Sequence, residues 1–517
     1  MHNEKKQFTK AAGIIGIFTL ASRILGFIRD MVIAWFFGAG LLSDAFFVAF
    51  RLPNLFRRLF GEGSLTVAFI PVFSEHISKY GKEEAFQMAR SAVRMLSVIL
   101  VIIILIGIIT APGIVRIMAP GFTGAQFSTT VTLTQIMFPY IFFICLVALS
   151  MGILNVLGHF AAPALAPVFL NLSIITAVLF ISPHLSDPII GLAIGVLIGG
   201  ILQLLLQLPF LVHKGFYFWQ KAGFYHPGLK SIGHMMLPAV FGAAVYQINM
   251  LVSTLLASFL PEGSVSYLYY ADRLVQFPLG IFAISMSVAI LPSLSRQAES
   301  KDMHALTDTF SYAIKLIFFI TIPAMTGLII LRHPIVALLF ERGAFDPVSS
   351  KLTADALLYF SLGLWAFSAV RIVVPTFYAL QDTKTPVKIA AISVLANMVL
   401  CLALMKPLAH AGLALAASLS SILNFILLIL ALRNKLGALG GKKIIESISK
   451  SVICSSVMGI SLQVFIGVNA TASASSVFAR LWVVFAGIFL GIFVYGLTAY
   501  IAKSRELIDI IKIIKKG

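Results

Sequence analysis

Long runs of apolar residues alternate with short polar stretches along this chain. Many runs hold about 20 residues or more, the length at which an α-helix crosses the hydrocarbon core of a bilayer. Glycine and proline mark the breaks between runs, as at Gly38, Pro112, Pro183, Pro261 and Gly441. The pattern therefore predicts membrane-spanning helices from end to end, with no room for a soluble domain of about 100 residues.

We expect fourteen spans, and hence an all-α polytopic membrane protein. Composition agrees, because 59% of residues are hydrophobic and 11% are charged, whereas a soluble globular chain carries about 25% charged residues. The approximate limits of the spans are 11–37, 42–73, 88–111, 131–157, 161–182, 188–212, 231–259, 267–294, 306–331, 353–380, 386–405, 410–432, 446–468 and 479–502.

The formal net charge is +18, and what it implies depends on where the basic residues lie. In a soluble chain it would suggest nucleic acid, but here lysines and arginines lie mostly in short loops, where they set topology. We therefore expect no nucleic-acid partner. With the N-terminus inside, few basic residues fall in the outer loops, which predicts that both termini are cytoplasmic. The outer set is Arg116, Arg332, Arg342, Lys351, Lys406 and Arg480.

The chain contains none of the motifs that mark nucleotide hydrolysis, metal binding or a catalytic nucleophile. Cys145, Cys401 and Cys454 fall within apolar runs, so we expect structural thiols rather than a disulfide framework. Arg23 and Arg29 interrupt the first apolar run, so we expect no cleavable signal peptide. These features predict a transporter rather than an enzyme, with no cofactor and no metal site.

An internal repeat divides the chain. Residues 191–203 (GLAIGVLIGGILQ) match 412–424 (GLALAASLSSILN) at an offset of 221, and the segments around Pro71 and Pro292 match at the same offset. Each unit holds six spans, so both enter the membrane the same way, as a parallel repeat. We predict a first lobe in 1–220, a second lobe in 221–436, and two extra helices with a basic tail in 437–517.

Charged residues within the spans are the candidate functional groups, because each costs about 2.5–3.5 kcal/mol at mid-membrane and usually faces a water-filled cavity. A proton relay would favour carboxylates, whereas arginine offers a planar fork of donors suited to phosphate. Arginines outnumber acids here, which predicts an anionic cargo. The set is Arg23, Arg29, Asp30, Asp44, Arg51, Arg57, Arg58, Glu62, Asp272, Arg273 and Arg371.

The alternative is that these arginines are structural, paired with the nearby acids or reaching toward the interface. Arg371 and Arg51 are the members for which we most expect a structural role. Asp44, Arg51 and Arg58 fall at heptad spacing, but Pro53 between them is expected to break the helix and shift its phase. Spacing therefore does not decide whether Arg57 or Arg58 faces inward.

Two weaker features lie in the second half of the chain. The polar segment QDTKTP at 381–386 includes Lys384 and opens a span; it is either a cytoplasmic gate or a solvated turn, the turn being the default. Asn397 within a span either helps to bind a cation or makes an interhelical hydrogen bond, and we favour the hydrogen bond.

Four segments stand in a diagnostic order: SRILGFIRD at 22–30, GAGLLSDAFFVAFRLPNLFRRLFGEG at 38–63, YYADRLVQFP at 269–278 and QDTKTPVKIA at 381–390. Together they resemble the MurJ (MviN) family of lipid II flippases, and the resemblance covers essentially the whole chain. It implies the MATE-like fold of the multidrug/oligosaccharidyl-lipid/polysaccharide (MOP) exporters, with two six-helix lobes and a groove for a polyprenyl tail at the last two helices.

The resemblance also implies the cargo and its site. The cargo would be lipid II, an undecaprenyl-diphosphate-linked disaccharide-pentapeptide, moved from the inner to the outer leaflet of the bacterial inner membrane by alternating access. The implied substrate-binding residues are Arg23, Arg29, Arg57, Arg273, Asp44 and Glu62. Candidates for gating or coupling are Asp30, Arg58, Asp272, Lys384 and Asn397.

One departure concerns coupling. Some family members resemble sodium-coupled machines with carboxylate and Asn ligands on helices seven and eleven. Span seven here has Gln247 and Asn249 but no acid. We therefore do not expect a sodium site of that type, and membrane potential or another ion is left to supply the drive.

Several alternatives stay open. A drug or cation exporter of the same superfamily would need acids in the cleft, and a flippase for another polyprenyl-linked glycan would differ only in headgroup. A membrane enzyme acting on lipid II would need convergent acids in outer loops, which Asp187, Glu262, Glu341, Asp346 and Asp355 do not form. A scaffold role is compatible with transport, so the cell-wall synthesis machinery is a candidate partner. We expect a monomer in the lipid bilayer.

Overall fold

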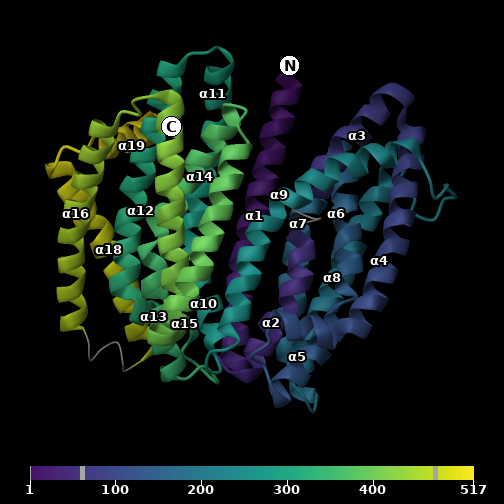
Figure 1. Ribbon diagram of the computed structural model, residues 1–517, viewed down its shortest axis with the longest axis horizontal. Coiled ribbons are helices and arrows are strands. Elements are labelled where there is room, and N and C mark those ends of the chain that lie inside the picture. Colours follow the sequence, from purple (N-terminus) through teal and green to yellow (C-terminus); the bar gives the residue numbers. More distant parts are fainter. Residues whose placement is uncertain (1, 59–63, 470–475, 517) are drawn as a thin grey trace. The chain divides into compact units, whose positions relative to one another are not determined.

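The computed structural model describes residues 2–58, 64–469 and 476–516. Within these ranges the chain is helical and has no strand, which confirms the all-α prediction. It divides into two compact units, Met1–Val265 and Ser266–Gly517. In each unit long helices pack side by side (Figure 1).

The first unit is built around three neighbouring helices, α6, α7 and α8, which pack on one another. On one side α7 also packs against α1, and on another α9 packs against α3 and α4. The helices are α1 (His2–Phe37), α2 (Leu41–Phe56), α3 (Ser64–Tyr80), α4 (Lys82–Met118), α5 (Gly124–Met137), α6 (Tyr140–Val156), α7 (Ala161–Thr176), α8 (Ile189–His213) and α9 (Pro227–Ala257).

The second unit is built around α12, which packs against α13, α14, α16 and α18. The helix α10 begins at the boundary between the units and continues through a π-helical turn into α11. The helices are α10 (Ser264–Pro278), α11 (Ile284–Glu299), α12 (Met303–Phe340), α13 (Pro347–Leu362), α14 (Leu364–Ala379), α15 (Lys384–Leu436), α16 (Gly441–Val468), α18 (Val477–Ile501) and α19 (Arg505–Lys516).

The described helices include nine that are long and apolar enough to cross a membrane, and the pair α13 and α14, bent by 42°, makes a tenth. One of the nine, α15, has 53 residues and leaves helical geometry at Ala409, where φ is 48°. This break follows Pro407, so the two arms of α15 correspond to two predicted spans. The chain is a multi-pass membrane protein, and the total of fourteen spans stays a prediction.

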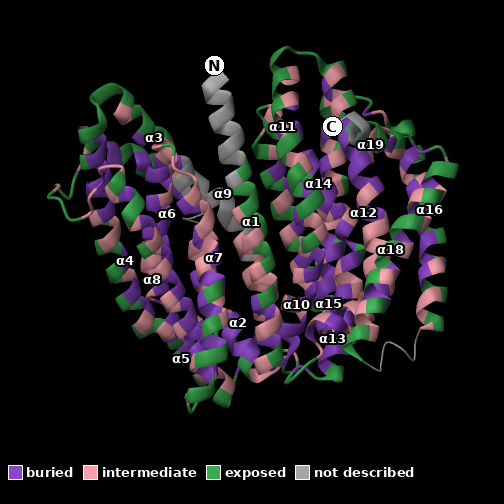
Figure 2. Cartoon of the chain, turned by 180° about the vertical axis from the view of Figure 1, so that it is seen from behind, coloured by how far each residue is buried: buried purple, intermediate pink, exposed green. Residues whose placement is uncertain are grey.

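Burial separates helices that face protein from helices that face lipid. In the most apolar stretch of Gly124–Val156, 72% of residues are buried, against 22% in α18. Figure 2 shows long exposed and half-exposed faces on α16 and α18. Phe478, Phe489 and Phe493 on α18 are exposed aromatic side chains. Because such residues are costly in water, these faces are those of a helix in contact with hydrocarbon.

The core of the first unit explains where its boundary falls. Phe73 stacks between Phe69 and Phe86 at the junction of α3 and α4, and Leu229 and Ile232 of α9 join the same buried cluster. This packing places α9 in the first unit, so the contact boundary follows Val265 rather than residue 220. The division at 220 and 436 describes the sequence repeat, which contacts do not test.

Candidate functional site

Two buried charges of the predicted set are adjacent on α1. Arg29 donates from Nε and Nη2 to Oδ1 of Asp30, at 3.0 and 2.7 Å. The side chains are 8% and 1% exposed. A charge removed from water is costly unless a partner and hydrogen bonds compensate it, so the two residues stabilise each other inside the helix bundle.

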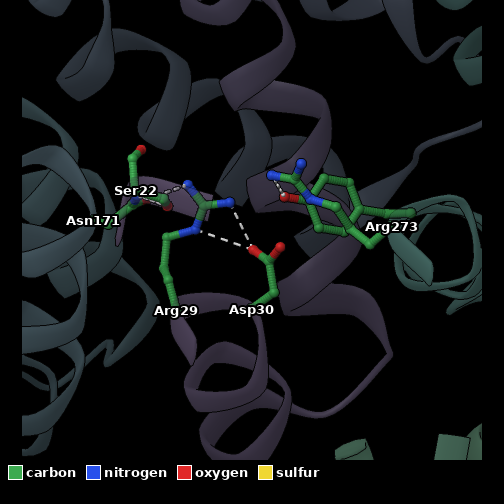
Figure 3. Close-up of polar contacts among 6 residues, drawn as sticks. Ser22, Arg29, Asp30, Asn171 and Arg273 are labelled. Carbon is green, nitrogen blue, oxygen red and sulfur yellow. Dashed lines mark hydrogen bonds and ion pairs between the residues drawn. The ribbon is translucent and has the colours of Figure 1, made fainter. Parts of the chain in front are cut away.

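A third residue, Asn171, fixes this pair to the neighbouring helix α7. Asn171 of α7 accepts a hydrogen bond from Nη1 of Arg29 at 3.1 Å and donates to the carbonyl of Ser22 at 3.0 Å (Figure 3). Close packing of α1 on α7 makes these contacts possible. Asn171 was not among the predicted site residues, although an asparagine in the middle of a strongly apolar span was a visible signal.

Arg23 lies on the same helix in a different environment. Arg23 is exposed to solvent or lipid, whereas Arg29, six residues later, is buried. Six residues turn an α-helix by about 240°, so Arg23 lies on another face of α1 from Arg29, whereas Asp30, seven residues away, lies on the same side of the helix as Arg23. The alternative of a structural ion pair therefore describes Arg29, whereas Arg23 presents its charge outside the packed core.

The beginning of α2 carries Asp44, which is 1% exposed. Its Oδ2 accepts a hydrogen bond from the backbone N–H of Gly263 at 2.7 Å. Gly263 has φ of 87°, a conformation that favours glycine, and it leads directly into α10. At the same end of the unit, Ser258 Oγ accepts a hydrogen bond from the N–H of Gly121. Asp44 therefore holds the turn that precedes α10.

The end of α2 faces α9 across a small cavity. Arg51 and Arg58 line it together with Asn54, Gln247 and Met250, and its volume is about 20 Å³. This space holds roughly one water molecule, so it does not accommodate a diphosphate in the present conformation. Arg51, expected to be structural, thus shares a cavity with Arg58.

Pro53 does not break α2, and that expectation was wrong. The helix continues to Phe56, and a π-helical turn follows at Arg57 and Arg58. Such a turn changes the phase of the side chains without ending the helix. Arg57 Nε donates to Oδ1 of Asn54 at 3.0 Å, while Arg58 lines the cavity. Glu62 lies outside the described residues.

In the second unit Arg273 lies on α10. Its Nη2 is 3.3 Å from the hydroxyl of Tyr269 one turn earlier, and its guanidinium stands 5.4 Å from the centroid of that ring (Figure 3). A cation over an aromatic face is attracted to the ring's electrons. Neighbouring Asp272 accepts a hydrogen bond from Gln276 on the same helix. Tyr269 is a second residue that the sequence analysis missed as a partner.

The remaining candidates lie on α15 or before it. Asn397 is buried, and its Oδ1 accepts a hydrogen bond from Ser420 Oγ at 3.4 Å on the other arm of α15. The expected hydrogen bond between spans is therefore present. Cys401 Sγ also lies 3.8 Å from the same oxygen. Arg371 on α14 is exposed.

The QDTKTP loop is an ordered turn built on Asp382. This carboxylate accepts hydrogen bonds from the N–H groups of Lys384 and Thr385 and forms an ion pair with Lys435 at the end of α15. Lys435, followed by Thr385, holds the pKa of Asp382 well below its usual range. Lys384 itself is exposed, so it contributes its backbone to the turn rather than its charge.

Comparison with known proteins gives one consistent family. The family model described as "Lipid II flippase MurJ" matches residues 33–485. A "Probable lipid II flippase MurJ" of Vibrio cholerae is 40% identical over 432 residues, 82% of each chain. A "Lipid II flippase MurJ" of Burkholderia cenocepacia is 37% identical over 424 residues, covering 81% of this chain and 82% of that protein.

Solved structures agree on the fold. "Lipid II flippase MurJ, inward closed conformation" superposes with a TM-score of 0.81 at 29% identity, covering 96% of this chain and 99% of that one. An inward-facing multidrug resistance MATE family transporter of the MOP superfamily gives a TM-score of 0.70 at 19% identity, covering 81% and 96%. The MATE-like fold prediction is confirmed.

Proposed function

This chain belongs to the lipid II flippase MurJ family, and from that premise we propose that it moves lipid II from the inner to the outer leaflet of the bacterial inner membrane. The observation that carries the proposal is the family match over residues 33–485, joined to a structural likeness that covers 96% of the chain. The activity is transport, without a covalent step.

Arginines that are not fully buried are the candidates for contact with the diphosphate of the cargo, each within its own unit. Arg23 is exposed, Arg58 lines the cavity beside α9, and Arg273 stands over a tyrosine ring. A guanidinium pairs with phosphate through two parallel hydrogen bonds. Since the cavity at Arg58 has room for one water molecule only, binding there requires α2 and α9 to separate.

Arg29 has a different role in this proposal. Its Nε, Nη1 and Nη2 already donate to Asp30 and Asn171. We assign the Arg29–Asp30–Asn171 contact to positioning: it holds α1 against α7 and so fixes the face of α1 that presents Arg23. Arg57, bound to Asn54, positions the end of α2 in the same way.

Alternating access requires contacts that form in one state and break in another. We assign such a contact to Asp44 and the N–H of Gly263, which ties the start of α2 to the turn before α10. A second candidate is the ion pair of Asp382 with Lys435. With both termini in the cytoplasm, as the loop charges predict, the first contact lies on the outer side and the second on the inner side.

Coupling to sodium through Asn397 receives little support. Its amide oxygen is engaged by Ser420 and approached by Cys401, and the described residues hold no group of three or more His, Cys, Asp or Glu that could bind a metal ion. We therefore assign Asn397 to the contact between the two arms of α15, and membrane potential or another ion is left to drive the cycle. Moving one charge across the potential is worth about 2.3 kcal/mol per 100 mV.

The test is lipid II exposure at the outer face of cells whose own flippase has been shut off. Exposure is read with an added enzyme that cleaves lipid II and cannot cross the membrane. Expression of this chain should restore exposure, Arg23→Ala should abolish the restoration, and Arg371→Ala, another exposed arginine within a helix, should not. No restoration by protein that is present in the membrane would reject lipid II as cargo, in favour of another polyprenyl-linked glycan or a small molecule.

A further inference from the structure

The C-terminal helix α19 has no part in the proposed transport cycle, yet its sequence is strongly amphipathic. Residues 505–516 read RELIDIIKIIKK, in which apolar pairs alternate with charged positions at helical spacing. The helix follows α18, a membrane-spanning helix that ends at Ile501, after a turn of only three residues. In that turn Lys503 adopts φ of 49° and the N–H of Ser504 bonds to the carbonyl of Ala499. α19 therefore starts where the span ends, at the level of the lipid headgroups.

The helix is fixed to its own unit rather than trailing from it. Glu506 is buried and accepts hydrogen bonds from Ser447 Oγ of α16 at 2.8 Å and from Ser504 Oγ at 2.7 Å. Leu507 and Ile510 pack against the cluster that includes Phe319, Met458 and Tyr495. Figure 1 shows α19 at the end of the second unit beside α12 and α16.

This anchoring accounts for only part of the apolar face. Ile508 and Ile511 each follow one of the packed residues, Leu507 and Ile510, and so lie on the next part of the helix surface. They are 40% and 38% exposed. Arg505 and Lys512 are exposed beside them, and Lys442 and Lys443 are exposed at the start of α16, two turns or less before Ser447. The free flank of α19 thus joins apolar side chains to a rim in which these four basic residues outnumber the acids Asp509 and Glu446.

We propose that this flank of α19 is an interfacial binding surface for anionic phospholipids of the adjacent leaflet. Ile508 and Ile511 insert at the boundary between headgroups and acyl chains, and Arg505, Lys512 and the α16 lysines contact the phosphates. Apolar insertion combined with a basic rim is the physical basis of anionic-lipid selectivity in surface helices. Because Glu506 fixes α19 to α16, the bound lipid also sets the depth of α16 and α18.

The experiment uses the full-length protein in vesicles of phosphatidylcholine alone or with phosphatidylglycerol added. A spin label at Ile511→Cys reports depth through its relative accessibility to oxygen and to a polar nickel reagent; Cys145, Cys401 and Cys454 are buried. We expect the label to move deeper when phosphatidylglycerol is added, and Arg505→Gln/Lys512→Gln to abolish that shift. Lys221→Gln/Lys230→Gln, two exposed lysines of the other unit, is the matched control and should retain it.

Two results would overturn the proposal. A label in water in both vesicle types would mean that the exposed isoleucines face solvent. A label at the same depth in both types, unchanged by the double substitution, would mean that protein packing alone places the helix. Transport activity enters neither result, so the outcome is independent of the proposed function.

Discussion

Two arginines on α1 show how the same side chain serves different purposes within one helix. Arg29 is buried, and its donors are satisfied by Asp30 and Asn171, whereas Arg23 is exposed six residues earlier. A buried, paired arginine stabilises packing and is a poor ligand for an incoming anion, since binding would have to displace its partners. A count of arginines in spans therefore overestimates the charge available to cargo.

The largest effect is expected from Arg29→Ala. Removing one member of a buried pair leaves the other charge without compensation, at a cost of about 3–5 kcal/mol. We expect a clear loss of thermal stability in detergent together with loss of transport. Asp30→Asn/Arg29→Gln, which removes both charges and keeps polar groups, should recover part of the stability. Wild-type stability in Arg29→Ala would remove the distinction drawn here between Arg29 and Arg23.

Asp44→Ala should have the next largest effect. A hydrogen bond to a charged group contributes about 1.5–3 kcal/mol, and this substitution removes the carboxylate that holds the N–H of Gly263. We expect faster hydrogen exchange in the segment before α10, with little change at α7. Ser43→Ala, which removes the neighbouring hydroxyl bonded to the carbonyl of Gly38, is the local control. Unchanged hydrogen exchange near Gly263 would show that the turn is stable without the hydrogen bond to Asp44.

Arg23→Ala sharpens the comparison because it should separate transport from stability. Exposed substitutions usually change stability by about 0.5 kcal/mol or less. We expect the unfolding temperature of the wild type with a loss of flipping of tenfold or more, and Arg23→Lys should retain part of the activity because it keeps charge without the planar fork. A large drop in unfolding temperature would place Arg23 with Arg29 as a structural residue.

The smallest effect is expected at the Asp382 turn. Its pKa is lowered, so its stabilising contribution is complete above the unfolded value of about 3.9 and is lost as pH falls through the lower folded value. Asp382→Asn should therefore lower the unfolding temperature by a constant amount between about pH 5 and 8, and by less below about pH 4. If the difference in unfolding temperature between the wild type and Asp382→Asn grew on acidification, the pKa of Asp382 would not be lowered by folding.

The sequence predicted the helical architecture well because apolar runs of membrane length admit few alternatives. Turn residues also placed real breaks, as at Gly38 and Pro261, whereas α4 continues through Pro112. The prediction failed at Pro53, where α2 continues to Phe56 and a π turn follows at Arg57 and Arg58. Local reasoning sees the lost N–H of a proline but not the neighbouring helices that keep the segment helical.

The candidate site was predictable in residue type and less so in role. The sequence marked Arg29 and Asp30, and an asparagine within an apolar span was visible at 171, but nothing in the sequence joined Asn171 to Arg29, 142 residues away. Likewise Asp44 was grouped with the arginines, while the structure joins it to a glycine 219 residues later. Both roles depend on tertiary contacts, which spacing along one helix does not encode.

The central claim is that this chain flips lipid II and that Arg23 binds its diphosphate. The most direct measurement is transfer of fluorescent lipid II between the leaflets of vesicles that contain the purified protein, with Arg23→Ala and Arg371→Ala compared at equal amounts of folded protein. We expect transfer by the wild type and Arg371→Ala and little by Arg23→Ala. Equal transfer by all three would contradict the assignment of Arg23, and no transfer by any would contradict the cargo.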